Sequence, residues 1–324
     1  MLLASKTEES IAMTTTEVSI IDVSMRDGIQ NEAMLVPFNL RLEIIKKLIG
    51  AGVKSLQIAS FVNHLRVPQM AGIESLVEQL PAINGVEYSG LVLNATGLTR
   101  LGSSGLKHVD LSLSCSDAHS VRNAGLTATA ALAQALTMIG TAKAAGLGVR
   151  VGLQCAFGCN FSGAVPMSRV VAMARDLAAA GCDSLALADS TGQAVPADIT
   201  AMIHAVRAVC TLPLVLHLHD TRGLGMANLL AGFQSGVRRF DASLGGVGGC
   251  NFIPGATGNI AIEDVLYLFD RMGVATGITL AELLPAARIL EQALGVPLPG
   301  RMYQLAKKSG GTSGPRSSEV AAWA

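Results

Sequence analysis

The chain has 324 residues, of which 50% are hydrophobic and 15% are charged, and its formal net charge is zero. That length can bury the core of one large α/β domain or of two smaller ones. A neutral chain without a basic block gives no electrostatic reason to expect nucleic acid or an anionic membrane as a partner.

Targeting and membrane signals are not evident in this sequence. No window of about 18 residues reads as a spanning helix, and residues 1–16 have the features of neither a secretory signal nor a transit peptide. The six cysteines lack the close, even spacing of a disulfide framework, which indicates reduced thiols. We therefore expect a cytoplasmic protein with no membrane partner.

Strand-like and helix-like segments alternate along the chain. The predicted strands are 18–24, 53–60, 87–93, 108–114, 148–155, 184–190, 212–220 and 238–244. The predicted helices are 39–51, one opening at Pro68, one ending near Gly105, 127–145, 167–180, one opening at Pro196, 224–235 and 260–272. Eight such units predict an α/β fold, a (β/α)8 TIM barrel. A doubly wound open sheet is the alternative, but the G-x-G-x-x-G loop that usually follows its first strand is absent.

The barrel pattern also sets the expected domain limits. We expect a mobile N-terminal segment over 1–16, the barrel over 17–273, a C-terminal helical extension over 274–308 and a flexible tail over 309–324. The extension contains one further predicted helix, 280–294.

The seventh predicted strand carries a histidine pair, His217 and His219. Because side chains alternate along a strand, both imidazoles point to the same face and could form half of a metal site. A partly buried pair whose hydrogen bonds are satisfied by neighbouring backbone is the alternative interpretation. The loop 245–259 has six glycines among its fifteen residues, together with Cys250 and Asn259. Such a loop lets backbone approach a ligand closely, and this favours the metal site.

Active sites of TIM barrels lie at the C-terminal ends of the strands. Asp27 follows the first predicted strand, so that Asp27, His217, His219 and Asn259 offer a mixed nitrogen and oxygen set typical of Mg²⁺ or Mn²⁺. Zinc is less favoured, because Cys155 and Cys159 form a C-x3-C pair without a second pair, which we interpret as structural or loop-lining. Asp220 faces away from His219, and we expect it to cap the following helix.

Several segments resemble the 3-hydroxy-3-methylglutaryl-CoA (HMG-CoA) lyases, a barrel family of metal-dependent lyases related to acyl-CoA condensing enzymes. They are MRDGIQNE, ASFVNHLRVPQM, CAFGCNFSG, ADSTGQAVP, HLHDTRGLGMANLLAG and GGVGGCNFIPGATGNIAIEDVLYLF. The resemblance extends from about Val18 to Gly295. It is most specific in the Cys250 loop, where GxGGC is followed by GAxGN.

The resemblance implies the (β/α)8 fold and a cleavage of HMG-CoA to acetyl-CoA and acetoacetate, as in leucine degradation, with Mg²⁺ or Mn²⁺ as cofactor. It also implies an acyl-CoA as the partner and a homo-oligomer. It places metal ligation on Asp27, His217, His219 and Asn259, and assigns carbonyl polarisation to Arg26, proton transfer to Cys250 and a place near the reacting centre to Asp189. Residues expected to contact the substrate or CoA are Arg26, Gln30, Gln57 and Asn123.

The chain departs from the family pattern at three places. Gln57 stands where the family has Glu, Asp117 and His119 alter the segment after the fourth strand, and the segment around Asp189 reads LALADS where the family has SLGDT. If position 57 faces the ion, Gln57→Glu should raise metal affinity through Coulomb attraction. These departures keep two alternatives open: a lyase for a related branched substrate, such as isohexenylglutaryl-CoA or citramalyl-CoA, and a non-catalytic metal-binding barrel.

Overall fold

The computed structural model describes residues 17–249 and 258–309. The segments 1–16 and 310–324, for which the sequence predicts a mobile N-terminus and a flexible tail, lie outside the described residues. So do residues 250–257, which include Cys250.

Eight parallel strands form a closed barrel in sequence order, and β1 closes it by pairing with both β2 and β8. The strands are β1 Ser19–Asp22, β2 Ser55–Ser60, β3 Glu87–Val92, β4 His108–Ser114, β5 Gly148–Gln154, β6 Ser184–Asp189, β7 Leu214–Leu218 and β8 Arg239–Ala242. The TIM-barrel prediction is confirmed.

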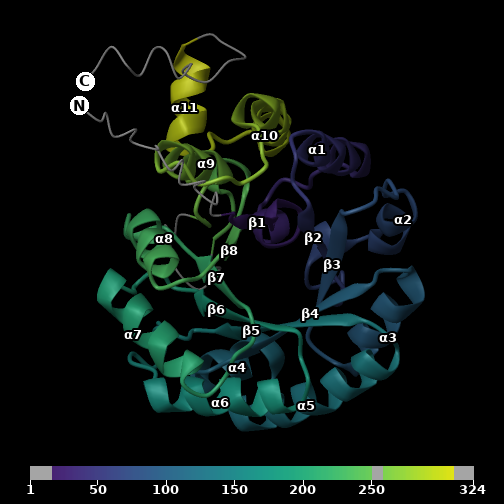
Figure 1. Ribbon diagram of the computed structural model, residues 1–324. Coiled ribbons are helices and arrows are strands. Elements are labelled where there is room, and N and C mark those ends of the chain that lie inside the picture. The colour runs from purple at the N-terminus through teal and green to yellow at the C-terminus, as the bar shows by residue number, and fades with distance from the viewer. Residues whose placement is uncertain (1–16, 250–257, 310–324) are drawn as a thin grey trace, which may run out of the picture.

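Helices surround the barrel, as Figure 1 shows. Those between strands are α1 Phe38–Gly50, α2 Ile73–Glu78, α3 Ala95–Ser104, α4 Asp117–Ala124, α5 Ala128–Ala144, α6 Met167–Ala179, α7 Pro196–Arg207 and α8 Gly225–Gln234. After β8 come α9 Ile262–Arg271, α10 Leu280–Leu294 and α11 Arg301–Lys308. The C-terminal helices therefore exist as expected, and Thr279 joins them to the barrel by donating its N–H to the carbonyl of Ala51 at 2.8 Å. None of the described helices combines the length and apolar character needed to cross a membrane.

Several elements differ from the sequence-based prediction. The first strand ends at Asp22, and a π-helical turn, η1 Ser24–Gly28, follows it. The helix expected to open at Pro68 is a 3₁₀ turn, η2 Pro68–Met70, and α2 begins only at Ile73. A second 3₁₀ turn, η3 Leu244–Gly246, follows β8. The short helices α4 and α11 were not predicted individually, because eight residues give little hydrophobic periodicity to detect.

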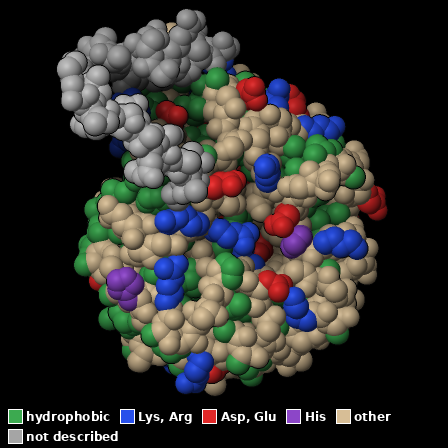
Figure 2. Space-filling view, viewed as in Figure 1, with side chains coloured by type: hydrophobic (Ala, Val, Ile, Leu, Met, Phe, Trp, Pro, Cys, Tyr) green, Lys and Arg blue, Asp and Glu red, His purple; other side chains and the backbone are tan. Residues whose placement is uncertain are grey.

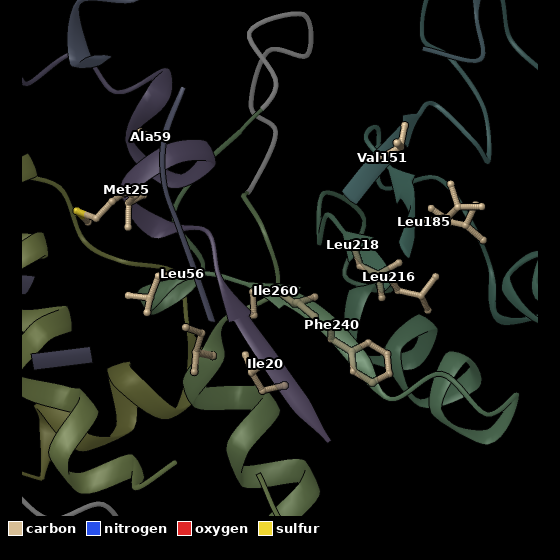
Figure 3. Packing of buried hydrophobic residues seen from close by; sticks show 14 of the residues in the cluster. Ile20, Met25, Leu56, Ala59, Val151, Leu185, Leu216, Leu218, Phe240 and Ile260 are labelled. Atoms are coloured by element: carbon tan, nitrogen blue, oxygen red, sulfur yellow. The ribbon is translucent and has the colours of Figure 1, made fainter. Parts of the chain in front are cut away.

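The main core lies between the outer face of the barrel and the helices. On β7, Leu214, Leu216 and Leu218 are all buried in this layer. Figure 3 shows Leu216 and Leu218 together with Phe240 of β8 among these packed side chains. The alternate positions of the strands point into the barrel, where a separate small cluster is formed by Ile21, Val23, Ala186 and Val215. The remaining interior positions are largely polar, and they form the site.

Candidate active site

Three side chains meet closely enough to hold a metal ion. One ligand atom from each of Asp27, His217 and His219 can be chosen so that all lie within 4.8 Å of one another. The Nε2 atoms of the two histidines are 3.1 Å apart, and each is 3.7 Å from Oδ2 of Asp27. The two histidines therefore face the same way, as their spacing on the strand predicts.

Asn259 joins this cluster because the chain segment before α9 pairs with the end of β7. Ile260 donates its N–H to the carbonyl of Leu218 at 3.1 Å, and Asp220 donates its N–H to the carbonyl of Gly258 at 3.0 Å. The Nδ2 atom of Asn259 then donates to Oδ2 of Asp27 at 2.8 Å. Its Oδ1 atom is buried and has no hydrogen-bond partner among the described atoms. A buried acceptor without a partner beside a carboxylate and two imidazoles fits a cation site.

The protonation states of the cluster also fit a metal site. Burial, assisted by the charge of His217, lowers the pKa of His219 to about 4, so that this imidazole is neutral at pH 7. Burial opposes ionisation of Asp27, but Arg26, the two histidines and the amide of Asn259 together outweigh it and hold its pKa well below the usual range. Ligands that are already deprotonated need not release protons when a metal ion binds.

The π-helical turn η1 brings Arg26 to the cluster beside Asp27. The guanidinium of Arg26 contacts Oδ1 of Asp27 at 2.5 Å, and its Nε donates to Oε1 of Gln57. The turn requires glycine at position 28, because a Cβ there would lie 2.6 Å from Cγ2 of Val247. Single π-helical turns are often found at functional sites because they place side chains where a regular helix would not.

A cavity of about 940 Å³ opens beside the cluster. It is lined by Arg26, Asp27, His217 and His219, and by Gln30 and Asn31 after η1. Further lining residues are Asn94 after β3, Gln154 at the end of β5, and His119, Arg122 and Asn123 of α4. Figure 2 shows a hollow near the centre of the face seen in Figure 1, with charged side chains and a histidine around it. Gln30, Gln57 and Asn123 therefore line the same cavity as the metal cluster, and Asn123 donates to Oε1 of Gln154 at 3.2 Å.

The two other predicted catalytic residues have different outcomes. Cys250 lies outside the described residues. Asp189 is buried, and its two carboxylate oxygens accept the backbone N–H groups of Gln193 and Ala194 at 3.1 and 3.0 Å. Its neighbours Ala188 and Ser190 line the cavity, whereas Asp189 is not among the described residues that do so. The structure thus gives Asp189 a role in ordering the loop after β6.

The structural interpretations of three other residues can also be compared with the fold. Oδ1 of Asp220 accepts the N–H of Gly225 at 2.7 Å, so Asp220 caps α8 as predicted. Cys155 and Cys159 are buried, and neither belongs to a group of possible metal ligands in the described part of the chain. These two cysteines are therefore consistent with a structural role.

Sequence reasoning missed three charged residues inside the barrel. Arg150 of β5 forms ion pairs with Asp110 of β4 and Asp241 of β8, each at 2.6 Å. Oδ2 of Asp241 lies 3.1 Å from Nδ1 of His217. Burial disfavours the charged form of Asp241, but Arg150 and His217 outweigh burial and lower the pKa of this carboxyl. The signal was present in the sequence, because each of these charges interrupts an apolar strand pattern.

Comparison with known proteins connects this site to a family. The family model described as HMGL-like matches residues 17–290. The chain belongs to the HMGL-like family and is a carbon–carbon lyase. It is 40% identical over 293 residues to an (R)-citramalyl-CoA lyase of Chloroflexus aurantiacus, covering 87% of this chain and 92% of that protein. It is 33% identical to a hydroxymethylglutaryl-CoA lyase of Bacillus subtilis, covering 90% of this chain and 98% of that protein.

Solved structures agree with this assignment. The HMG-CoA lyase of Bacillus subtilis is 32% identical with a TM-score of 0.87, covering 90% of this chain and 98% of that one. An HMG-CoA lyase of Acinetobacter baumannii, solved in complex with coenzyme A and 3-methylmalate, is 31% identical with a TM-score of 0.85. The match covers 89% of this chain and 94% of that one. The resemblance that the sequence motifs indicated is therefore confirmed.

Proposed function

We propose that this family member is a divalent-metal-dependent lyase that cleaves HMG-CoA to acetyl-CoA and acetoacetate. The observation that carries the proposal is the meeting of Asp27, His217 and His219 beside Arg26 on the wall of one cavity, with Asn259 bound to Asp27. A barrel that served only to bind a metal would have no need of a guanidinium held next to the ligands. This arrangement therefore argues against the non-catalytic alternative.

The four candidate ligands suit Mg²⁺ or Mn²⁺, because these ions bind carboxylate and amide oxygens and have further coordination positions for the substrate. Such an ion would act as a Lewis acid toward the hydroxyl and a neighbouring oxygen of the substrate. The protein side chains supply the rest of the chemistry. Neutral His219 and ionised Asp27 are in the states needed to bind the ion at neutral pH.

Arg26 is the group that would stabilise the developing enolate. Loss of the hydroxyl proton turns the hydroxyl carbon into a ketone as the carbon–carbon bond breaks, and the bonding pair moves into the enolate of the acetyl thioester. The positive guanidinium of Arg26 would stabilise the charge on the thioester oxygen. Cys250 would then donate a proton to the enolate carbon to give acetyl-CoA, and the glycine-rich loop that carries it would exclude water from the reacting atoms.

Two candidates for the base that accepts the hydroxyl proton follow from the sequence, Asp189 and a nearby histidine. The arrangement favours His119, because it lines the cavity and is not one of the proposed metal ligands, while the carboxylate of Asp189 is engaged by two backbone N–H groups. Gln30 and Asn123, which line the same cavity, are proposed to contact the acyl-CoA.

A second substrate is supported by one specific observation. The (R)-citramalyl-CoA lyase is 40% identical to this chain, more than the 33% and 35% of two bacterial HMG-CoA lyases. Citramalyl-CoA lacks one methylene between the hydroxyl carbon and the carboxylate, and its cleavage gives pyruvate in place of acetoacetate. The cavity also has small residues at Gly152, Ala186 and Ala188, which leave room for a longer branch such as that of isohexenylglutaryl-CoA.

A product analysis tests the proposal directly. The purified protein is incubated with Mg²⁺ or Mn²⁺ and, separately, with HMG-CoA, (R)-citramalyl-CoA and isohexenylglutaryl-CoA, and acetyl-CoA and the keto acid are quantified. We expect acetyl-CoA release that stops in excess chelator and returns with added metal. The largest kcat/KM identifies the substrate, with acetoacetate marking HMG-CoA and pyruvate marking citramalyl-CoA. Full turnover of metal-free protein would contradict the metal mechanism. Size-exclusion chromatography with light scattering tests the expected homo-oligomer.

A further inference from the structure

A continuous chain of polar contacts crosses the barrel interior and joins the two sides of the candidate site. It begins at Arg26 beside Asp27 and ends at the imidazole of His217. The six side chains in order are Arg26, Gln57, Asp110, Arg150, Asp241 and His217. All six line the cavity.

Asp110 occupies the middle of this chain. Its Oδ1 accepts Nε of Arg150 at 2.6 Å, and its Oδ2 accepts both the hydroxyl of Ser89 at 2.5 Å and Nε2 of Gln57. The strand register produces these contacts, because Asp110 lies opposite Arg150 in the pairing of β4 with β5. The register of β7 with β8 likewise sets His217 opposite Asp241. Side chains at paired positions of neighbouring strands point to the same face.

The contacts of Asp110 fix how Gln57 is oriented. An amide has one donating end and one accepting end. Because the carboxylate of Asp110 can only accept, Nε2 of Gln57 must face it, and Oε1 is left to accept from Nε of Arg26. A carboxylate at position 57 would instead meet the carboxylate of Asp110. Gln57 and Asp110 are therefore a matched pair of hydrogen-bond donor and acceptor. Gln57 contacts Arg26 rather than the candidate metal ligands.

We propose that Asp110 is a positioning residue for the reaction, acting through Gln57 on Arg26 and through Arg150 and Asp241 on His217. This inference rests on the role proposed above for Arg26. It changes the expectation for Gln57→Glu, because the repulsion from Asp110 should outweigh any added attraction for the metal ion. The carboxylate of Asp110 on β4 faces position 57 on β2, so a negative charge added at position 57 would lie against another negative charge.

A charge-exchange cycle tests this proposal, with Gln57→Glu, Asp110→Asn and the double variant compared with the unaltered protein. In the double variant the new carboxylate at position 57 accepts from Arg26, and the new amide at position 110 donates to that carboxylate while its oxygen accepts from Arg150. We therefore expect each single variant to lose about 30-fold or more in kcat with little change in KM, and the double variant to recover to within about 5-fold. Asp176→Asn, at an exposed ion pair with Arg175, is the control and should leave kcat unchanged.

Thermal stability and metal affinity are measured on the same four proteins without substrate. The double variant should recover most of the fall in Tm that each single variant shows, on the order of 3 °C or more. Recovery of folding in the double variant, where a single variant does not fold, supports the pairing in the same way. Losses that add in the double variant overturn the pairing. A recovery of Tm without any effect of Asp110→Asn on kcat overturns the positioning role.

These readouts separate the inference from the proposed function. Absence of acyl-CoA cleavage by the unaltered protein would contradict the proposed function, while the Tm cycle would still decide whether positions 57 and 110 are coupled. Conversely, an active protein with additive losses would retain the proposed function and remove Asp110 from its machinery.

Discussion

The inner and outer faces of the same strands have different functions in this barrel. On β7, Leu214, Leu216 and Leu218 pack against the helices, while His217 projects into the barrel toward Asp27. The outer face forms one continuous apolar core, whereas apolar residues inside the barrel form only a small separate cluster. One residue of displacement along a strand thus separates a side chain that stabilises the fold from one that binds or orients reacting groups.

The two faces also respond differently to substitution. Apolar packing tolerates exchange at similar volume. The inner polar groups depend on each other's charge and direction, as the contacts of Asp110 with Gln57 and Arg150 show. Substitutions inside the barrel should therefore affect activity more than stability, and substitutions outside should do the reverse.

His217→Ala should give the largest loss of activity. Removing one of four candidate ligands weakens metal binding and leaves Asp241 without its imidazole partner. We expect kcat/KM to fall by about 1,000-fold or more at limiting metal. Metal content by elemental analysis and kcat/KM at several Mn²⁺ concentrations check this. Normal metal occupancy in this variant would remove His217 from the ligand set.

Cys250→Ser should reduce kcat by about 100-fold while metal content stays unchanged, because a serine hydroxyl is a much weaker acid than a thiol. Alkylation of the unaltered protein should inactivate it, and bound substrate should slow that inactivation. Rates of iodoacetamide inactivation with and without substrate test the accessibility. A variant that lost its metal would place Cys250 among the ligands and contradict the proton-transfer role.

Leu216→Ala tests the outer face. Leu216 is fully buried, and a Cβ added to Gly232 of α8 would lie 2.2 Å from its Cδ1, which shows how closely strand and helix pack there. Truncation should lower the free energy of unfolding by about 2–4 kcal/mol through the cavity it leaves. Denaturant titration measures this, with the exposed Leu305→Ala as control. Below the unfolding transition kcat should change by less than about 3-fold, and a loss comparable to that of His217→Ala would break the distinction between the two faces.

Gly152→Leu should have the smallest effect of these substitutions, and it should change the relative kcat/KM of different substrates. A Cβ at this position would meet only ordinary contacts, 3.7 Å to the carbonyl of Leu111 and 3.9 Å to the hydroxyl of Ser112. The added side chain would project into the cavity without forcing the backbone to move. We expect roughly 10-fold discrimination against substrates with a longer acyl branch, and little change for the smallest one that is cleaved. Equal effects on all substrates would show that the branch binds elsewhere.

The sequence by itself determined the strand–helix alternation and much of the candidate site. The H-x-H spacing placed His217 and His219 on one face because alternation along a strand is a local property. The motifs around Asp27 and Asn259 identified the family, which the comparisons confirm. The apolar run around Leu216 was also predicted to be a strand, because such a run bounded by turn signals indicates burial.

Only the tertiary structure decided which inner residues touch. Asp110, Arg150 and Asp241 lie on different strands, and closure of the barrel with its particular register is what brings their charges within 2.6 Å. The same closure turned Gln57 toward Arg26 and Asp110, where the sequence had suggested proximity to the ion. It left Asp189, at the end of β6, bound to the backbone N–H groups of the loop that follows. Local patterns specify the direction of a side chain relative to its own strand. Its partners depend on strand order and register, which are properties of the whole barrel.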